Sequence, residues 1–281
     1  MSTSLALLAA ALLGSSDFLG GLASRRARSV LVTVVGQAVG FPVVLLDLLA
    51  LPGRPGGEAV LWGALSGLAG GIGMVLFYRT MSRAAMSVVS AVAAFSEGGL
   101  PLVAGVVLLG ERPSSLGWAG LVIGLAGVPL LCWSRSDAGP IRSSRALRSV
   151  LLGLAAGGLF GLSLILLARS PADSGQWPVL ASRVATLAVA GAILLTSTGG
   201  TRIEGVPLRL AVLAGVLQAG ASIAYLVAVR LGSLAAVAVL QAMYPAATIA
   251  LSTLLLGERL RRAQMVGVTM VVIAVLLIAL R

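Results

Sequence analysis

Long apolar runs dominate this sequence, each about 20 residues long and each ended by charged residues or by proline and glycine. A helix needs about 20 mostly apolar residues to cross a hydrocarbon core of about 30 Å. The runs are continuous and do not alternate, which argues against the strands of a membrane barrel. They predict ten transmembrane helices, at residues 4–23, 30–50, 60–78, 85–109, 116–133, 148–168, 177–197, 209–228, 233–256 and 263–280.

The composition agrees with a lipid bilayer as the solvent. Hydrophobic residues make up 58% of the chain and charged residues 10%, and the mean hydropathy is +1.06, whereas soluble proteins carry about 25% charged residues. A net charge of +11 raises the possibility of nucleic-acid binding. The arginines separate apolar runs and do not gather on one polar domain, so we expect the bilayer as partner and no nucleic acid.

Histidine is absent, and the one cysteine is Cys132. Zinc catalysis and imidazole acid–base chemistry therefore lack their usual residues. No Walker loop is present, since the glycine pairs sit inside apolar runs without the following lysine. We expect no metal, no cofactor and no ATP-driven step in this chain.

The string LLGER occurs twice, at residues 108–112 and 255–259, with a spacing of 147. The same shift places Tyr78 on Tyr225 and Gly14 on Gly161, which indicates an internal repeat. Five predicted helices lie on each side of the polar stretch WSRSDAGPIRSSRALRS. The predicted parts are a first repeat at 1–134, a basic linker at 135–147 and a second repeat at 148–281.

An odd number of helices per repeat has a consequence for topology. The second repeat must enter the membrane upside down relative to the first. The predicted fold is therefore an all-α membrane protein of ten transmembrane helices in two inverted five-helix repeats. Such repeats are typical of transporters that work by alternating access, with the substrate site near the midplane between the repeats, although channels also contain them.

Three stretches resemble a known family. These are GSSDFLGG (14–21), FSEGGLPLVAGVVLLGERPSSLGWAGLVIGLAGVPLL (95–131) and MYPAATIALSTLLLGERLRRAQMVGVTMVVIAVLLI (243–278). They resemble the EamA repeat of the drug/metabolite transporter superfamily, over almost the whole chain. The first copy departs from the pattern, because the position equivalent to Pro245 is Gly98. The resemblance implies ten helices, a central cavity and secondary transport, often export of amino acids or other metabolites, but no particular substrate.

Two acids fall inside predicted helices, where an ionised side chain costs at least about 2.5–3.5 kcal/mol near mid-bilayer. Glu97 lies at the middle of the fourth helix, and Asp17 lies past the middle of the first. As functional sites they would hold a proton or a cationic substrate. Alternatively, Glu97 pairs with Arg183 or Arg79 to hold helices together, and Asp17 caps a helix that is broken or kinked at GSSDFLGG.

Other polar residues are candidates for the substrate site. Ser96, Gln241 and Tyr244 are expected to line the cavity, and Pro245 to kink the ninth helix at the midplane. Arg183 either binds an anion or a carboxylate or extends to the interface, which is the commoner explanation. Tyr78 and Tyr225 fall near helix ends, where interfacial tyrosines are common.

Each LLGER string ends a predicted helix, where glycine can terminate it. Glu111 and Glu258 then lie at the membrane boundary, beside Arg112 and Arg259. Each carboxylate either caps the N-terminus of the next helix, where the helix dipole favours negative charge, or forms a gate with an arginine of the other half.

Two arguments about the orientation of the chain in the membrane disagree. Loops after odd-numbered helices carry 14 arginines and the other side carries 6, so the positive-inside rule predicts both termini outside. The family resemblance implies both termini inside. We expect a multi-pass protein of a bacterial plasma membrane; the sequence indicates no oligomeric state.

The leading hypothesis is a secondary transporter of small metabolites such as amino acids, an exporter working by alternating access, with proton coupling through Glu97 left open. Two alternatives remain. An intramembrane enzyme would need a catalytic constellation, and the sequence offers two separated acids. A scaffold that transports nothing would have a narrow, dry interior.

Overall fold

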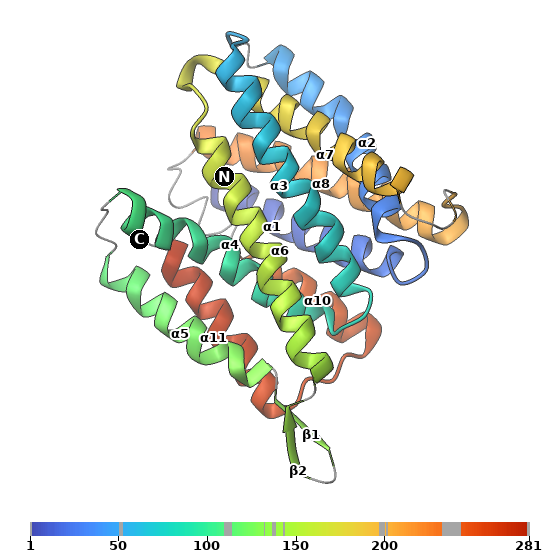
Figure 1. The fold of residues 1–281 in the computed structure, drawn as a ribbon, viewed down its shortest axis with the longest axis vertical. Helices are drawn as coiled ribbons and strands as arrows, with labels where there is room; N and C mark the ends of the chain where they lie inside the picture. Colours follow the sequence, from blue (N-terminus) through green and yellow to red (C-terminus); the bar gives the residue numbers. More distant parts are fainter. Residues whose placement is uncertain are drawn as a thin grey trace.

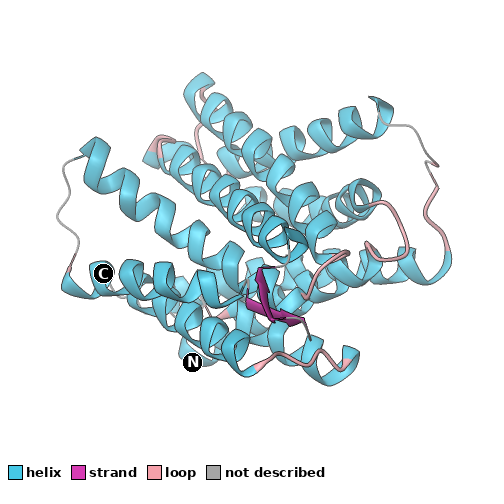
Figure 2. Ribbon diagram, turned by 60° about the horizontal axis from the view of Figure 1, so that its bottom comes forward, coloured by secondary structure: helices cyan, strands magenta, loops and turns pink. Residues whose placement is uncertain are grey.

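The computed structural model describes residues 2–50, 53–109, 114–131, 133–136, 139–142, 144–196, 200, 202–231 and 243–279. Nearly all of these residues are helical (Figure 2). The elements are α1 (Ser2–Ala23), α2 (Ser29–Ala50), α3 (Gly57–Met81), α4 (Met86–Leu109), α5 (Ser115–Leu131), β1 (Trp133–Ser136), β2 (Gly139–Arg142), α6 (Ser144–Ala168), the 3₁₀ turn η1 (Ala172–Ser174), α7 (Trp177–Thr196), α8 (Gly205–Leu231), α10 (Tyr244–Leu256) and α11 (Arg262–Ala279). The labels pass from α8 to α10 because residues 232–242 are not among those described.

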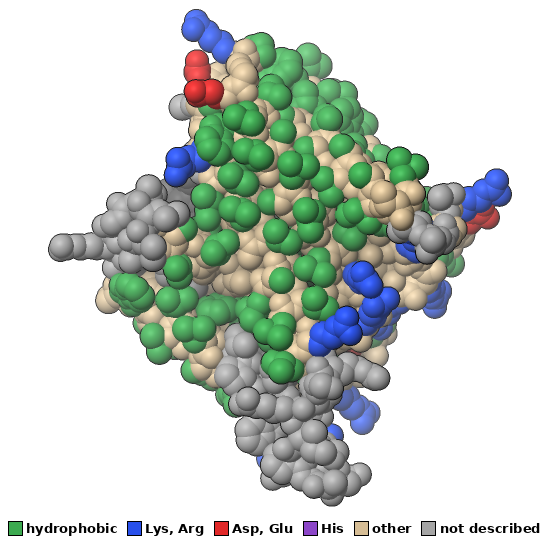
Figure 3. All heavy atoms as spheres, viewed as in Figure 1, with side chains coloured by type: hydrophobic (Ala, Val, Ile, Leu, Met, Phe, Trp, Pro, Cys, Tyr) green, Lys and Arg blue, Asp and Glu red, His purple; other side chains and the backbone are tan. Residues whose placement is uncertain are grey.

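Six described helices are long and apolar enough to cross a membrane: α1, most of α2, α3, α6, α7 and most of α8. Apolar stretches of α5, α10 and α11 are shorter. The surface fits a lipid environment, because large side chains such as Leu46, Leu49 and Val122 are exposed. On the face in Figure 3, hydrophobic side chains cover much of the bundle, and the charged side chains lie at its corners and in one basic cluster at the lower right. The chain is a multi-pass membrane protein.

The observed helices follow the predicted runs, with two differences. The linker expected at 135–147 contains a two-stranded antiparallel hairpin, β1 paired with β2, and α6 already begins at Ser144. The ninth predicted helix, 233–256, is described only as α10, which begins at Tyr244. The number of membrane crossings therefore stays a prediction.

The two halves of the chain interleave. Helix α1 packs along α8, and α6 packs along α3; likewise α1 contacts α10, and α6 contacts α4. The last helices of the halves, α5 and α11, lie side by side and run in opposite directions (Figure 1). Each half therefore buries its helices against the other, and the core belongs to both.

Glycines allow these close approaches. Gly63, Gly67 and Gly71 form one ridge of α3, and a Cβ at each would meet Pro178, Ser182 and Thr186 of α7. The ridge is spaced four residues apart on one helical face, as close packing in membranes requires. Thr186 Oγ1 donates to the Gly67 carbonyl at 3.0 Å across this contact. These three glycines therefore form a small-residue ridge along which α3 and α7 pack closely.

Candidate functional site

Glu97 and Tyr244, two of the predicted site residues, contact each other. Glu97 lies at the middle of α4, and Tyr244 is the first residue of α10. The Tyr244 hydroxyl donates to Glu97 Oε2 at 2.9 Å. The two residues are 147 positions apart, which is the repeat spacing, so equivalent positions of the two halves meet here. The partner of Glu97 is a phenol and not an arginine, so the alternative in which Glu97 pairs with Arg183 or Arg79 is wrong.

Asp17 lies beside this pair. Its side chain is buried in α1, and its charge interacts with that of Glu97. Helix α1 is continuous from Ser2 to Ala23, so the alternative in which Asp17 caps a broken helix is wrong. Tyr78 of α3 is also near Asp17: its ring lies against Gly20, and its hydroxyl interacts with Ser16 and Asp17. Two carboxyl groups and two phenols thus gather where α1, α3, α4 and α10 meet.

This cluster can hold a proton inside the membrane. Two carboxylates near each other cannot both ionise easily, because like charges in a medium of low dielectric repel strongly. A proton or a cationic ligand relieves that repulsion. No group of three or more His, Cys, Asp or Glu residues that could hold a metal lies in the described part of the chain.

Arg183 forms a second polar contact between the two halves of the chain. Its Nη1 donates to Gln37 Oε1 at 2.6 Å, which joins α7 to α2. The positions are 146 apart, so nearly equivalent residues of the two halves meet again. The guanidinium is directed into the bundle, and the prediction that Arg183 extends to the interface is wrong. A cavity of about 180 Å³ adjoins it, and its wall includes Gln37, Arg183 and Gln218.

Glu258 links the halves at one end of the bundle. It accepts hydrogen bonds from the backbone N–H groups of Met86 at 2.9 Å and Ser87 at 3.3 Å, and from Ser87 Oγ at 2.9 Å. It also forms an ion pair with Arg25 at 3.3 Å. The predicted capping role is therefore present, but the capped helix is α4 of the first half and not the next helix, α11. The preceding Gly257 ends α10 with φ of 63°, a left-handed conformation that suits glycine.

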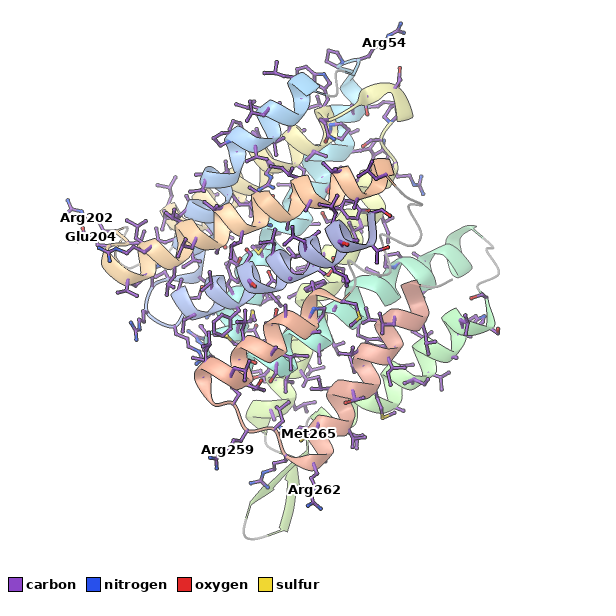
Figure 4. All side chains as sticks on the ribbon, turned by 180° about the vertical axis from the view of Figure 1, so that it is seen from behind. Arg54, Arg202, Glu204, Arg259, Arg262 and Met265 are labelled. Atoms are coloured by element: carbon purple, nitrogen blue, oxygen red, sulfur yellow. The ribbon has the colours of Figure 1, made fainter. Side chains whose placement is uncertain are left out.

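A basic hollow of about 610 Å³ surrounds this contact, lined by Arg25, Arg83, Arg259 and neighbouring residues of three loops. In Figure 4 the labelled Arg259 and Arg202 stand at one end of the bundle, and Arg54 stands at the opposite end. The loops after odd-numbered helices thus share a face, as the charge count assumes.

The remaining predicted site residues have other positions. Ser96 Oγ donates to the Leu154 carbonyl at 2.9 Å and so joins α4 to α6, away from both cavities. Pro245 lies in the first turn of α10, where its missing N–H is tolerated. The predicted kink depends on the residues before Met243, which lie outside the described residues. The predicted residues Gln241, Glu111 and Arg112 lie outside the described residues.

Sequence reasoning missed several of these contacts. Tyr78 was expected at the interface, but it is only 4% exposed and lies in the core. Gln218 was not singled out. The repeat shift carries Gln37 to Val184, next to Arg183, so the sequence indicated that these two positions are nearly equivalent, but not that they are in contact. Arg25 gave no such signal, since its equivalent position is Ala172.

Comparison with known proteins agrees with this arrangement. A model of the EamA-like transporter family matches residues 1–133 and again residues 147–280. Among solved structures, one described as "Crystal structure of protein" superposes with a TM-score of 0.62 and 21% sequence identity, over 98% of this chain and 96% of that chain. At this identity the likeness shows the fold alone. Comparison with curated proteins gave no match.

Proposed function

Since this chain belongs to the EamA-like transporter family, and is thereby a membrane transporter of the drug/metabolite transporter superfamily, we propose that it is a secondary transporter of small metabolites. It exports molecules such as amino acids by alternating access, in exchange for protons. Its ten helices cross the membrane as two inverted five-helix repeats, and substrate binds between the repeats.

Contacts that the repeat shift exchanges support the inverted arrangement. A Cβ at Gly14 would meet the backbone of Tyr244 and the side chain of Ala247. A Cβ at Gly161 would meet the Glu97 carbonyl and Leu100 Cβ. Adding 147 to one partner and subtracting 147 from the other turns the first set of contacts into the second. A two-fold axis between the halves produces this exchange, and the opposite directions of α5 and α11 favour an axis in the membrane plane.

The buried acid pair carries the proposal of proton coupling. Glu97 lies at mid-helix, bonded to the equivalent position of the other half. An ionisable residue at this depth is expensive and is by default a functional site. Movement of the halves against each other changes the Glu97–Tyr244 contact and the separation from Asp17. The acid can therefore load its proton in one conformation and release it in the other. The cavity between the halves supports a transporter over a scaffold with a dry interior.

Efflux from proteoliposomes tests the proposal. Vesicles are loaded with an amino-acid mixture, a pH gradient is imposed, and efflux is quantified by mass spectrometry. We expect Glu97→Gln to abolish the response to the gradient and to leave downhill exchange intact, because the amide keeps the shape and loses the proton. Glu204→Gln is the matched control, since this acid is exposed in the loop before α8.

Two results would count against the proposal. If the Glu97→Gln protein responds to the gradient as the wild type does, Glu97 has no coupling role. If the wild-type protein moves no component of the mixture faster than empty vesicles, amino-acid transport itself is wrong.

A further inference from the structure

The basic hollow at one end of the bundle collects positive charge from three separate loops. Arg25 follows α1, Arg83 follows α3 and Arg259 follows α10, and all three line a space of about 610 Å³. The loop between α10 and α11 belongs to the second half of the chain, and the other two loops belong to the first half. The three arginines are therefore brought together by the packing of the two halves and not by their order in the sequence.

The carboxylate of Glu258 also lines the hollow, and its oxygens are already engaged. Its Oε1 accepts hydrogen bonds from the Met86 N–H at 2.9 Å and from Arg25 at 3.3 Å, and its Oε2 accepts from Ser87. The N-terminus of α4 thus offsets part of the repulsion that this acid would exert on another anion. Among the described residues of the wall, three arginines against one acid leave a net charge of +2.

Arginines that converge in a hollow suit a phosphate group. Each guanidinium presents a planar set of N–H donors that can bond two phosphate oxygens at once, and it stays charged at physiological pH. The hollow has a volume of about 610 Å³, roughly that of twenty water molecules at about 30 Å³ each. A phosphate and part of its substituent fit such a space.

The loop between α10 and α11 is flanked on both sides by exposed apolar side chains. Leu254 and Leu255 precede the loop and are 79% and 68% exposed, and Met265 and Val266 follow it and are 54% and 52% exposed. Figure 4 shows Met265 at the same end of the bundle as Arg259. Exposed apolar side chains beside a basic site mark a place where a membrane lipid can contact the protein. A free phosphate would meet the arginines alone, whereas a phospholipid would meet both kinds of surface.

From this arrangement we infer that the basic hollow binds the phosphate group of an anionic phospholipid, whose acyl chains lie along the exposed apolar side chains of α10 and α11. A zwitterionic lipid carries its own cation beside the phosphate and gains less from the arginines. Because the loops come from both halves of the chain, a bound headgroup links the halves on this face. The inference does not depend on the proposed transport function.

Native mass spectrometry of the delipidated full-length protein in detergent tests the inference without requiring transport. The lipid probes are phosphatidylglycerol and phosphatidylcholine with identical acyl chains. Glycerol 3-phosphate and inorganic phosphate are the soluble sources of the same group. Phosphatidylglycerol should bind roughly tenfold more tightly than phosphatidylcholine, because each arginine near the headgroup attracts the net negative charge. The two soluble phosphates should bind more weakly than phosphatidylglycerol, because they lack the apolar contact.

A pair of charge-matched double variants locates the site. Arg83→Gln with Arg259→Gln removes two charges from the wall and leaves the Arg25–Glu258 ion pair in place. This variant should lose most of the preference for phosphatidylglycerol and keep its affinity for phosphatidylcholine. The control is Arg202→Gln with Arg209→Gln, which has the same net charge. These two arginines are exposed near the start of α8 and do not line the hollow, so the preference should stay as in the wild type. All four arginines are exposed, and equal unfolding temperatures of the two variants would show that both are folded.

Three results would overturn the inference. The first is equal affinity of the wild type for the two lipids. The second is an equal loss of preference in the two double variants, because charge anywhere on this face would then be sufficient. The third is binding of glycerol 3-phosphate or inorganic phosphate as tightly as phosphatidylglycerol, which would assign the hollow to a soluble anion.

Discussion

Substitution of Glu258 tests which interaction joins the two halves. Its carboxylate both accepts hydrogen bonds from the N-terminus of α4 and forms an ion pair with Arg25. Met86 and Ser87 donate to it from the start of α4. Loss of a helix cap costs about 1–2 kcal/mol, and a negative charge near a helix N-terminus is worth about 0.3–1 kcal/mol. We therefore expect Glu258→Ala to lower the free energy of unfolding by about 2–3 kcal/mol.

The ion pair should contribute less. The side chain of Arg25 is 32% exposed and that of Glu258 is 12% exposed, and exposed ion pairs are worth about 0–1 kcal/mol. Arg25→Ala should therefore cost less than about 1 kcal/mol. Ser87→Ala, which removes one hydrogen bond to the carboxylate, should cost about 1 kcal/mol.

Unfolding in mixed micelles, followed by circular dichroism, measures these values. A double-mutant cycle with Arg25→Ala and Glu258→Ala isolates the coupling between the two side chains. Arg26→Ala is the matched control, because this arginine is the exposed neighbour of Arg25. The reasoning is refuted if Arg25→Ala costs as much as Glu258→Ala, since the ion pair and not the cap would then join the halves.

Two further predictions concern packing and orientation. Gly14→Ala should destabilise the protein by about 1–3 kcal/mol, because the new Cβ would overlap the Tyr244 carbonyl oxygen. Gly158→Ala, which meets nothing within 4 Å, should be neutral or stabilising by up to about 1 kcal/mol; equal effects in thermal unfolding would contradict the contact. An alkaline phosphatase fused after Arg281 should be active if the charge bias sets the topology, whereas fluorescence of a cytoplasmic reporter there would support the orientation that the family implies.

The sequence was sufficient to predict most of the helices and one pair of site residues. Apolar run length is a local property, so the extents of helices such as α2 and α7 could be read directly. Glu97 was identifiable because an acid at mid-helix has few explanations. Its approach to Tyr244 followed from treating both as lining residues of the space between the halves.

The partners of long side chains could not be predicted. Glu258 was expected to cap the helix that follows it, yet the nearest free N–H groups belong to α4, far away in the chain. The space beside Gly40 that receives the Arg183 guanidinium exists only after α2 and α7 have packed, so the contact with Gln37 could not be predicted from the sequence.

Burial of Tyr78 was missed for a similar reason. A tyrosine near a helix end lies at the interface if the helix end does, but α3 extends to Met81, past the predicted end at residue 78. The hairpin in the linker depends on pairing between β1 and β2, for which the polar sequence carries no strong alternation.

The Glu258–Arg25 contact also bears on which face of the proposed transporter opens more easily. A transporter built of two identical inverted repeats would open to either side of the membrane with equal free energy. It would therefore have no preferred resting conformation. Arg25 is replaced by the uncharged Ala172 at the equivalent place in the second half, so the repeat relation cannot copy this ion pair to the opposite face. In the inverted arrangement proposed above, this difference at one residue would make the free energies of opening the two faces unequal.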